Sequence, residues 1–294
     1  MKLFAIELNN DIKGIPQRKQ YMESILSRLR NPDIVVFPEL ALCSYMACQE
    51  IWKYADDAGK DASEWAVGMA RKYHTYIGLG YLDRQDGDFY NRYMIAGPEG
   101  VCGVVTKSEG ETAVFKTGSF GSIIETSFGK VGVAICYDAK RRHFYENVKE
   151  QELSLILFPR GCPADPKKPE EEKKNIDDFC GKYADAFGIP VVYVNSVGKL
   201  EYMPGRMGRM MEKAGFRMNG HSKIYSKSLK MATGVPEAIA ADVELKPKGI
   251  AHPIRFYGRD LVRGNRLFRR FILKPDARAG LKLYEQNRPH SMPL

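Results

Sequence analysis

Short apolar runs alternate with amphipathic helical patterns along the chain, and this alternation is the feature that most constrains the fold. Runs such as 33–37 and 153–158 are rich in Val, Ile and Leu, which is typical of buried β-strands. Segments such as 17–30 and 170–187 instead repeat apolar residues at helical spacing. Alternating strands and helices predict an α/β fold in which helices cover sheets. No linker or internal repeat interrupts the pattern, so residues 1–294 are predicted to form one domain.

Composition and cysteine spacing narrow the classes of protein further. Apolar residues make up 44% of the chain and charged residues 28%, which is ordinary for a globular domain. The six cysteines show no metal-ligand spacing, so we expect free thiols and no metal site. The N-terminus runs directly into a strand pattern, and no apolar run has membrane-spanning length. We therefore expect a cytoplasmic protein without a membrane partner.

The chain is basic, with a formal net charge of +9 and a pI of about 9.1. Basic residues are densest in 199–230 and 255–282, but neither segment contains a recognisable nucleic-acid motif. We therefore predict a solvated basic surface and no specific nucleic acid, with attraction of anionic substrates as the alternative. The Met-, Gly- and Arg-rich segment 203–218 is predicted to be a mobile loop, which either is solvated, caps a pocket or makes a dimer contact.

Cys136 is a candidate nucleophile because it follows a buried-looking run that begins at Gly129. Open α/β sheets place their chemistry where such strands end. Polar and basic residues follow it at once, and the N–H of Tyr137 could donate to an oxyanion. The alternative is a buried thiol that packs as a small apolar side chain.

Two other strand-like runs end in charged residues. Glu39 directly follows the apolar run 33–37, where desolvation would raise the pKa of its carboxyl and make it a usable base. Lys107 ends the run 101–106, where its ammonium could hold an oxyanion and lower the pKa of a nearby thiol. The alternatives are a helix-start acid and a surface lysine. If these strand ends share one sheet edge, a carboxylate, an ammonium and a thiol meet there.

The order Phe37-Pro38-Glu39, Lys107 and Cys136-Tyr137-Asp138 resembles the Glu–Lys–Cys triad of the nitrilase (carbon-nitrogen hydrolase) superfamily. Further motifs agree in order along nearly the whole chain: Tyr90-Asn91, Glu111 with Phe115 and Gly118, Gly220-His221-Ser222-Lys223-Ile224, and Asp276-Ala277-Arg278 with Leu283-Tyr284.

The resemblance implies a four-layer α-β-β-α sandwich that forms a homodimer or a higher homo-oligomer. It also implies that Glu39 deprotonates Cys136, that Lys107 and the Tyr137 N–H hold the oxyanion, and that water hydrolyses a thioester. This implied mechanism needs no metal and no organic cofactor. Glu111 would orient Lys107 or the water. We expect the C-terminal extension, about residues 250–294, to contribute to the oligomer interface.

The substrate is less constrained than the triad. After Cys136 the family often continues with Arg-Phe-Pro-Glu, whereas this chain carries a basic stretch that includes Arg141. We predict Arg160, Arg141 and Tyr45 as substrate contacts, although either arginine could instead form a structural ion pair. The main hypothesis is an amidase or N-carbamoyl hydrolase acting on a small, anionic, linear amide. The alternatives are a nitrilase and a non-enzymatic binding protein with a basic surface.

Overall fold

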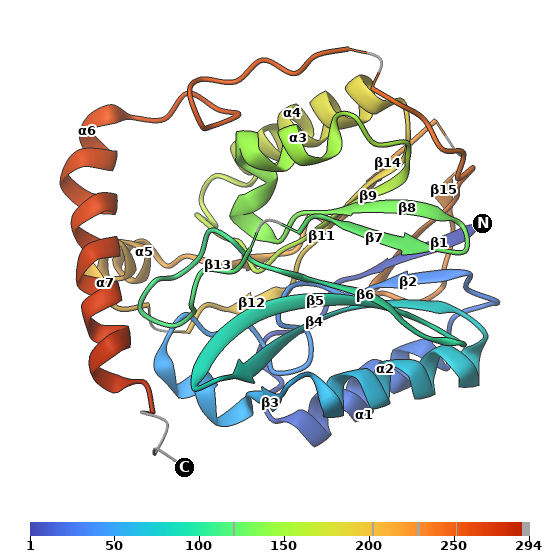
Figure 1. Cartoon of the computed structure of the whole chain (residues 1–294), viewed down its shortest axis with the longest axis horizontal. Helices are drawn as coiled ribbons and strands as arrows, with labels where there is room; N and C mark the ends of the chain where they lie inside the picture. The colour runs from blue at the N-terminus through green and yellow to red at the C-terminus, as the bar shows by residue number, and fades with distance from the viewer. Residues whose placement is uncertain (120, 202, 228–229, 251, 290–294) are drawn as a thin grey trace.

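The computed structural model describes residues 1–119, 121–201, 203–227, 230–250 and 252–289. Two β-sheets pack face to face, and a layer of helices covers the outer face of each (Figure 1). This is the α-β-β-α sandwich that the family resemblance implied. Among the described residues, no helix combines the length and apolarity needed to cross a bilayer.

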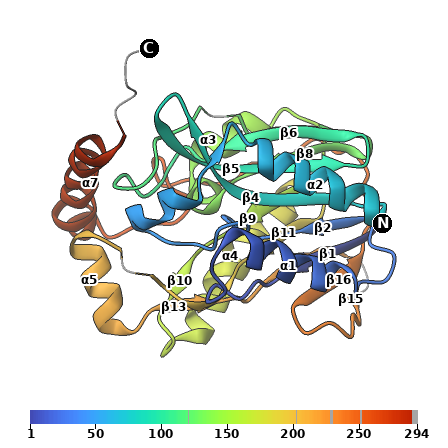
Figure 2. The same cartoon turned by 90° about the horizontal axis from the view of Figure 1, so that it is seen from below.

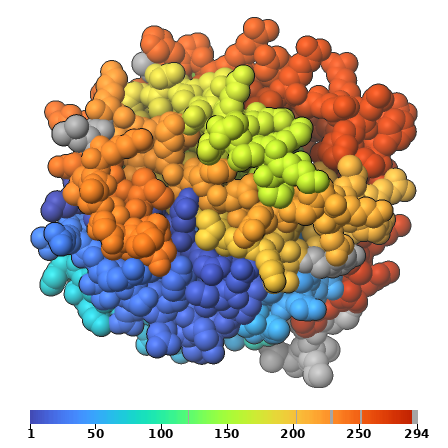
Figure 3. All heavy atoms as spheres, turned by 180° about the vertical axis from the view of Figure 1, so that it is seen from behind, coloured from blue at the N-terminus to red at the C-terminus, as the bar shows by residue number. Residues whose placement is uncertain are grey.

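The first sheet has the strand order β15-β16-β1-β2-β4-β5-β6, and β3 pairs with β4. The neighbours β1, β2 and β4 run parallel, whereas β5 is antiparallel to both β4 and β6. β16 pairs antiparallel with β1, and Figure 3 shows this region beside the N-terminal residues. The strands span Lys2–Ile6 (β1), Ile34–Val36 (β2), Asp56–Asp57 (β3), Tyr76–Gln85 (β4), Asp88–Gly97 (β5), Gly100–Thr106 (β6), Lys230–Met231 (β15) and Ala238–Asp242 (β16).

The second sheet has the order β14-β11-β9-β8-β7, with β8, β9 and β11 parallel. Its strands span Ile123–Thr126 (β7), Gly129–Val133 (β8), Leu153–Pro159 (β9), Val191–Val194 (β11) and Lys223–Tyr225 (β14). A small third sheet consists of Pro163–Ala164 (β10), Val197–Lys199 (β12) and Arg217–Asn219 (β13).

Three apolar clusters hold the layers together. The first joins α1 (Ile15–Leu26) and α2 (Lys60–Tyr73) to the first sheet, and the third joins α3 (Arg142–Val148) and α4 (Pro169–Phe187) to the second sheet. Between them, alternate residues of the two sheets interdigitate, with Ala5, Val36 and Tyr93 on one side and Val133 and Leu157 on the other. Burial of both faces explains the continuous apolar runs in the sequence.

The structure corrects the prediction of a mobile loop at 203–218. Residues Gly205–Ala214 form a helix, α5, which lies beside the C-terminal helix at one end of the molecule (Figure 2). Its capping residue Pro204 has no side-chain donor or acceptor for the helix, but the Asp276 carboxylate accepts a hydrogen bond from the Met207 N–H at 2.7 Å. A partner distant in sequence therefore supports the first turn, which local sequence does not reveal.

The C-terminal extension contains one continuous helical segment. It runs through α6 (Arg266–Phe268), a π-helical turn η3 (Arg269–Leu273) and α7 (Lys274–Asn287). We call residues 266–287 the C-terminal arm. In Figure 1 the arm stands along one end of the sandwich, next to α5.

Candidate active site

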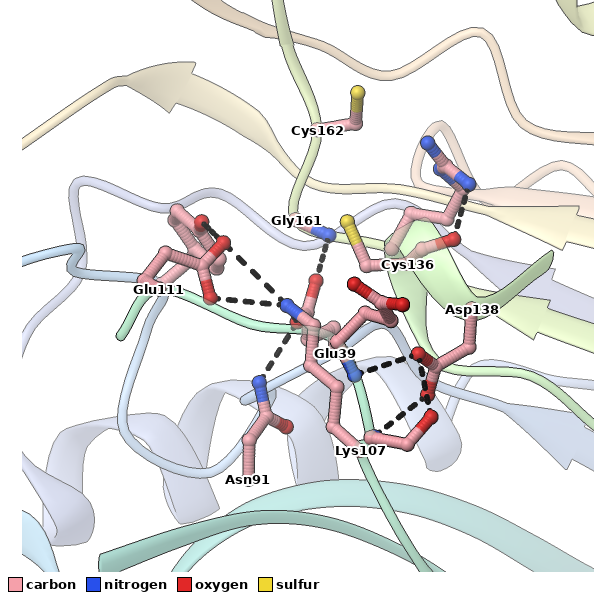
Figure 4. A network of polar contacts seen from close by, with 12 residues as sticks. Glu39, Asn91, Lys107, Glu111, Cys136, Asp138, Gly161 and Cys162 are labelled. Carbon is pink, nitrogen blue, oxygen red and sulfur yellow. Dashed lines mark hydrogen bonds and ion pairs between the residues drawn. The ribbon is translucent and has the colours of Figure 1, made fainter. Parts of the chain in front are cut away.

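The strand directions bring the predicted chemistry to one edge of the sandwich. β2 and β6 run in the same direction in the first sheet and end just before Glu39 and Lys107. β8 and β9 are parallel in the second sheet, and the segments after them carry Cys136 and Arg160. Figure 4 shows Lys107 and Cys136 close to Glu39.

Cys136 begins the 3-10 helix η2 (Cys136–Lys140), so β8 ends three residues earlier than the run that contains the cysteine suggests. Its backbone φ is +50°, a left-handed conformation that costs a non-glycine residue about 1–2 kcal/mol. Arg160 Nη1 donates a 2.6 Å hydrogen bond to the Cys136 carbonyl and helps to hold this turn. The side chain is almost covered, with 8% of the residue exposed.

The Glu39 carboxylate is fully buried and accepts three hydrogen bonds. Its Oε1 accepts from Lys107 Nζ and from Asn91 Nδ2, both at 2.7 Å, and its Oε2 accepts from the Gly161 N–H at 2.6 Å. A buried carboxylate needs such donors, because its desolvation is otherwise costly. The three donors also fix the orientation of the group.

Two glycines allow this close packing. A Cβ on Gly80 of β4 would lie 2.5 Å from the Leu40 backbone nitrogen and 2.6 Å from the Pro38 carbonyl oxygen. A Cβ on Gly161 would lie 2.2 Å from the Tyr45 ring. All three distances are too short for any larger residue at these positions, so the segment bearing Glu39 can approach the sheet only at glycine.

Lys107 lies between two carboxylates. Its Nζ is 2.7 Å from Glu39 Oε1 and 3.0 Å from Glu111 Oε2, and Glu111 Oε1 accepts a 2.6 Å hydrogen bond from the Tyr45 hydroxyl. Burial alone would lower the pKa of Lys107, but Glu111 and Glu39 raise it well above its ordinary value. The site therefore holds a permanent ammonium.

The Cys136 thiol is protonated in this environment. Burial and the nearby Glu39 charge raise its pKa, whereas Lys107 and Arg160 lower it. A thiol of this kind needs a base to become a nucleophile, and Glu39 is the carboxylate with the largest electrostatic effect on it.

Tyr137 places its backbone N–H in the first turn of η2. The first hydrogen bond within that turn is donated by the Asp138 N–H to the Ile135 carbonyl. The Tyr137 N–H lies one residue earlier and takes no part in that bond. The Tyr137 side chain is 42% exposed and lies under the Arg141 guanidinium, 4.5 Å from ring centroid to Cζ.

The three predicted substrate contacts occupy different settings. Tyr45 is buried and bonded to Glu111, next to the triad. Arg160 is 2% exposed and stacks near Phe179 and Tyr193, and among the described residues no carboxylate forms an ion pair with it. Arg141 instead pairs with Glu109 at 2.9 Å and with Asp260. Their roles toward substrate stay predictions.

The Asp138 carboxylate links the turn that contains Cys136 to the loop that follows Lys107. The sequence did not indicate this role. The carboxylate accepts hydrogen bonds from the Ser108 N–H at 2.9 Å, the Ser108 hydroxyl at 2.9 Å and the Glu109 N–H at 2.8 Å. These donors immediately follow Lys107. Burial raises the pKa of the Asp138 carboxyl to about 6, although the Ser108 N–H and Lys107 oppose the shift.

We expect Asp138 to shape the acid limb of the pH–activity profile. Protonation removes acceptor capacity that the 108–109 loop uses, so kcat/KM should fall as the pH drops through about 6. Because the folded pKa lies above the ordinary value of 3.8, the same protonation stabilises the fold as the pH falls. Asp138→Asn should lower kcat/KM roughly 10²-fold, as misplacement of a catalytic group does. It should also lose the ionisation near pH 6, and an unchanged acid limb would refute this assignment.

The segment after β9 is a second feature with little sequence signal. Asn195, which follows β11, accepts a 3.0 Å hydrogen bond from the Cys162 N–H and donates one of 3.0 Å to the Cys162 carbonyl. This clamp holds the turn that presents the Gly161 N–H to Glu39. All six cysteines are free thiols. Among the described residues, no cluster of three or more His, Cys, Asp or Glu side chains could hold a metal ion.

Comparison with known proteins identifies the family of this chain. The carbon-nitrogen hydrolase family model matches residues 10–243. A probable nitrilase of Schizosaccharomyces pombe is 29% identical over 44% of this chain and 50% of its own length, and an omega-amidase of Xenopus laevis is 25% identical over 44% and 52%. The chain thus spans about half the length of these curated relatives.

The fold has solved counterparts. A carbon-nitrogen hydrolase from Helicobacter pylori superposes with a TM-score of 0.66, covering 82% of this chain and 88% of that one at 19% identity. The family match places this protein in the nitrilase superfamily. The chain belongs to the carbon-nitrogen hydrolase family.

Proposed function

We propose that this protein is an amidase-type hydrolase of non-peptide C–N bonds that acts through a cysteine thioester. The observation that carries the proposal is the buried 2.7 Å contact between Lys107 Nζ and Glu39 Oε1, electrostatically coupled to the Cys136 thiol. Base, cation and nucleophile are then available together without a metal. Family membership and the amidase name of one relative support the reaction class.

In the acylation step, Glu39 takes the thiol proton while the sulfur of Cys136 attacks the amide carbon. The C=O π electrons move to oxygen, and the Lys107 ammonium and the Tyr137 N–H stabilise that oxyanion. Collapse of the tetrahedral intermediate breaks the C–N bond. The leaving nitrogen receives the proton from Glu39 and departs as ammonia or an amine, leaving a thioester.

In the deacylation step, Glu39 removes a proton from water, and the resulting hydroxide attacks the thioester. The C–S bond breaks, the sulfur recovers the proton, and a carboxylic acid is released. Glu111 contributes by holding Lys107 from the side opposite Glu39, at 3.0 Å, while the Tyr45 hydroxyl fixes Glu111 in turn. Its role is therefore to position the ammonium.

We propose a small, linear, anionic amide or N-carbamoyl compound as the substrate class. Arg160 supports this choice, because its Nε is buried without a hydrogen-bond partner and its guanidinium forms no ion pair with a described carboxylate. An unpaired buried cation beside the nucleophile favours an anion in the bound state. Arg141 supports it less, since two protein carboxylates already occupy its guanidinium.

We further propose a cytoplasmic homodimer or higher homo-oligomer, with part of the 250–294 extension at the interface. The free thiols fit a reducing compartment. A nitrilase is the second candidate, supported by the name of the Schizosaccharomyces pombe relative. We favour the amidase because Tyr137-Asp138 stands where nitrilases tend to carry Trp-Glu. A non-enzymatic binding protein is disfavoured because the triad residues are in contact or electrostatically coupled.

A panel of ω-amides, N-carbamoyl amino acids and the matching nitriles tests this proposal. We expect ammonia release from at least one anionic amide or carbamoyl compound, and little acid from the nitriles. Release should disappear in Cys136→Ala. Acid production from a nitrile with no amide turnover would replace the amidase by the nitrilase. Inactivity on the whole panel, together with failure of thiol reagents to label Cys136, would contradict both.

A further inference from the structure

The C-terminal arm concentrates the positive charge of the molecule. The arm and the residues that flank it, 262–288, contain eight Lys or Arg and two Asp or Glu, a net charge of +6, whereas the whole chain carries +9. Less than a tenth of the sequence therefore carries two thirds of the net charge. Neither the proposed chemistry nor the triad uses this charge.

The cations form an ordered row. Five exposed basic residues recur at every fourth position along the arm: Arg266, Arg270, Lys274, Arg278 and Lys282. Like charges at this spacing repel and destabilise a helix. Arg269, on the side facing the protein, pairs with Asp260 at 3.0 Å, but the five outward cations form no ion pair with a described carboxylate. Among the described residues, no carboxylate offsets the repulsion along this row.

Large apolar side chains lie between these cations. Leu267, Phe271 and Leu281 are exposed by 67%, 55% and 51%, the highest values among the large apolar residues that the structure describes. Leu273 is exposed by 36% on the same arm, and Met210 of the neighbouring α5 by 49%. A contiguous patch of exposed apolar side chains marks a contact surface.

The inner side of the arm is firmly attached, so its outer side is presented in a fixed orientation. The Thr112 hydroxyl donates to the Ala277 carbonyl at 2.9 Å, and the Tyr284 hydroxyl donates to Asp88 at 3.0 Å. A Cβ on Gly280 would lie 2.4 Å from Thr112 Oγ1, which shows how closely the helix packs. The arm thus rests on the residues that follow Glu111 in the active site.

We propose that the outer face of the C-terminal arm binds the surface of an anionic phospholipid membrane. Cations interleaved with Leu and Phe suit a lipid interface, where phosphates attract Arg and Lys while apolar side chains enter the acyl region. The phosphates of a nucleic-acid backbone would pair with the cations but would leave the leucines without an apolar partner. A symmetric contact between two copies through this face would bring two rows of like charge together. An oligomer would then use other parts of the extension.

Binding of the arm to a membrane surface differs from insertion of a helix across the membrane. The expectation of no membrane partner follows from the lack of a spanning apolar run, and an interfacial helix needs no such run. The proposed membrane binding is also independent of the proposed amidase activity, because none of the five cations touches the triad.

Sedimentation with lipid vesicles tests the proposal. The full-length protein is incubated with phosphatidylcholine vesicles with or without phosphatidylserine. We expect binding only to the anionic vesicles, weakening as salt rises. A variant with Arg266, Arg270, Lys274 and Arg278 changed to Gln should lose at least about tenfold in partition coefficient. The matched control changes the exposed Lys167, Lys168, Lys173 and Lys174 to Gln, removes the same charge, and should lose much less.

A second pair of variants separates lipid from other partners. Leu267→Ser with Phe271→Ser should weaken vesicle binding several-fold but leave attraction to duplex DNA unchanged, whereas Val101→Ser with Val104→Ser should alter neither. Equal binding to neutral and anionic vesicles would overturn the proposal. So would equal losses in the two Gln variants, tighter binding to duplex DNA than to vesicles, or an arm-dependent change of oligomeric mass without vesicle binding. Circular dichroism melts confirm that each variant is folded.

Discussion

Cys136→Ala is expected to lower kcat/KM for the best amide substrate by at least about 10⁴-fold, because it removes the sulfur that we propose forms the thioester. The fold should survive, since the change removes one buried sulfur and leaves the turn in the same left-handed conformation. Ammonia release measured on purified, folded protein gives the ratio directly.

Cys162→Ala is the matched control for this change. Cys162 lies two residues beyond Arg160, and its sulfur interacts with the Arg160 guanidinium and the Pro163 carbonyl but is not bonded to any triad member. We expect the control to retain activity within about tenfold. Loss of activity in Cys162→Ala with retention in Cys136→Ala would exchange the roles of the two thiols.

Lys107→Met should have the second-largest effect. It removes the ammonium that holds the oxyanion, for which we expect a loss of kcat of about 10²–10³-fold or more. It also leaves the carboxylates of Glu39 and Glu111 buried without their cation, which typically destabilises a protein by about 3–5 kcal/mol.

The destabilisation of Lys107→Met should depend on pH. Without the ammonium the pKa of the Glu111 carboxyl, which Lys107 lowers, rises, so the penalty is greatest at neutral pH and shrinks as acid protonates this carboxyl. Urea unfolding at several pH values measures this. Lys116→Met is the control, because Lys116 pairs with Asp88 while 44% of its side chain is exposed, and a small effect is expected. Equal stability losses in the two variants would contradict the buried cation.

The sequence predicted those parts of the site that lie directly at strand ends. Glu39, Lys107 and Cys136 each follow a run whose apolar character marks a buried strand, and parallel strands place their ends at one edge. The layered α/β architecture follows from the same alternation. Family resemblance added the four-layer arrangement, which the structure confirms.

What the sequence did not reveal depends on contacts between distant segments. The α5 helix contains two glycines and begins without a local cap, so propensity opposes it, and Asp276 of the arm supports it instead. The hydrogen bonds that residues 108 and 109 donate to Asp138 join segments 30 residues apart. The left-handed turn at Cys136 falls on a residue type that rarely adopts it, so local sequence gave no sign of it.

We propose that the buried Cys136 thiol carries the reaction, and site-resolved alkylation tests this most directly. The protein is treated with iodoacetamide for increasing times, and peptide mass spectrometry quantifies modification at each of the six cysteines while residual amide hydrolysis is measured. We predict that activity falls in direct proportion to modification of Cys136 and that substrate protects both. Full modification of Cys136 with activity intact would contradict the account.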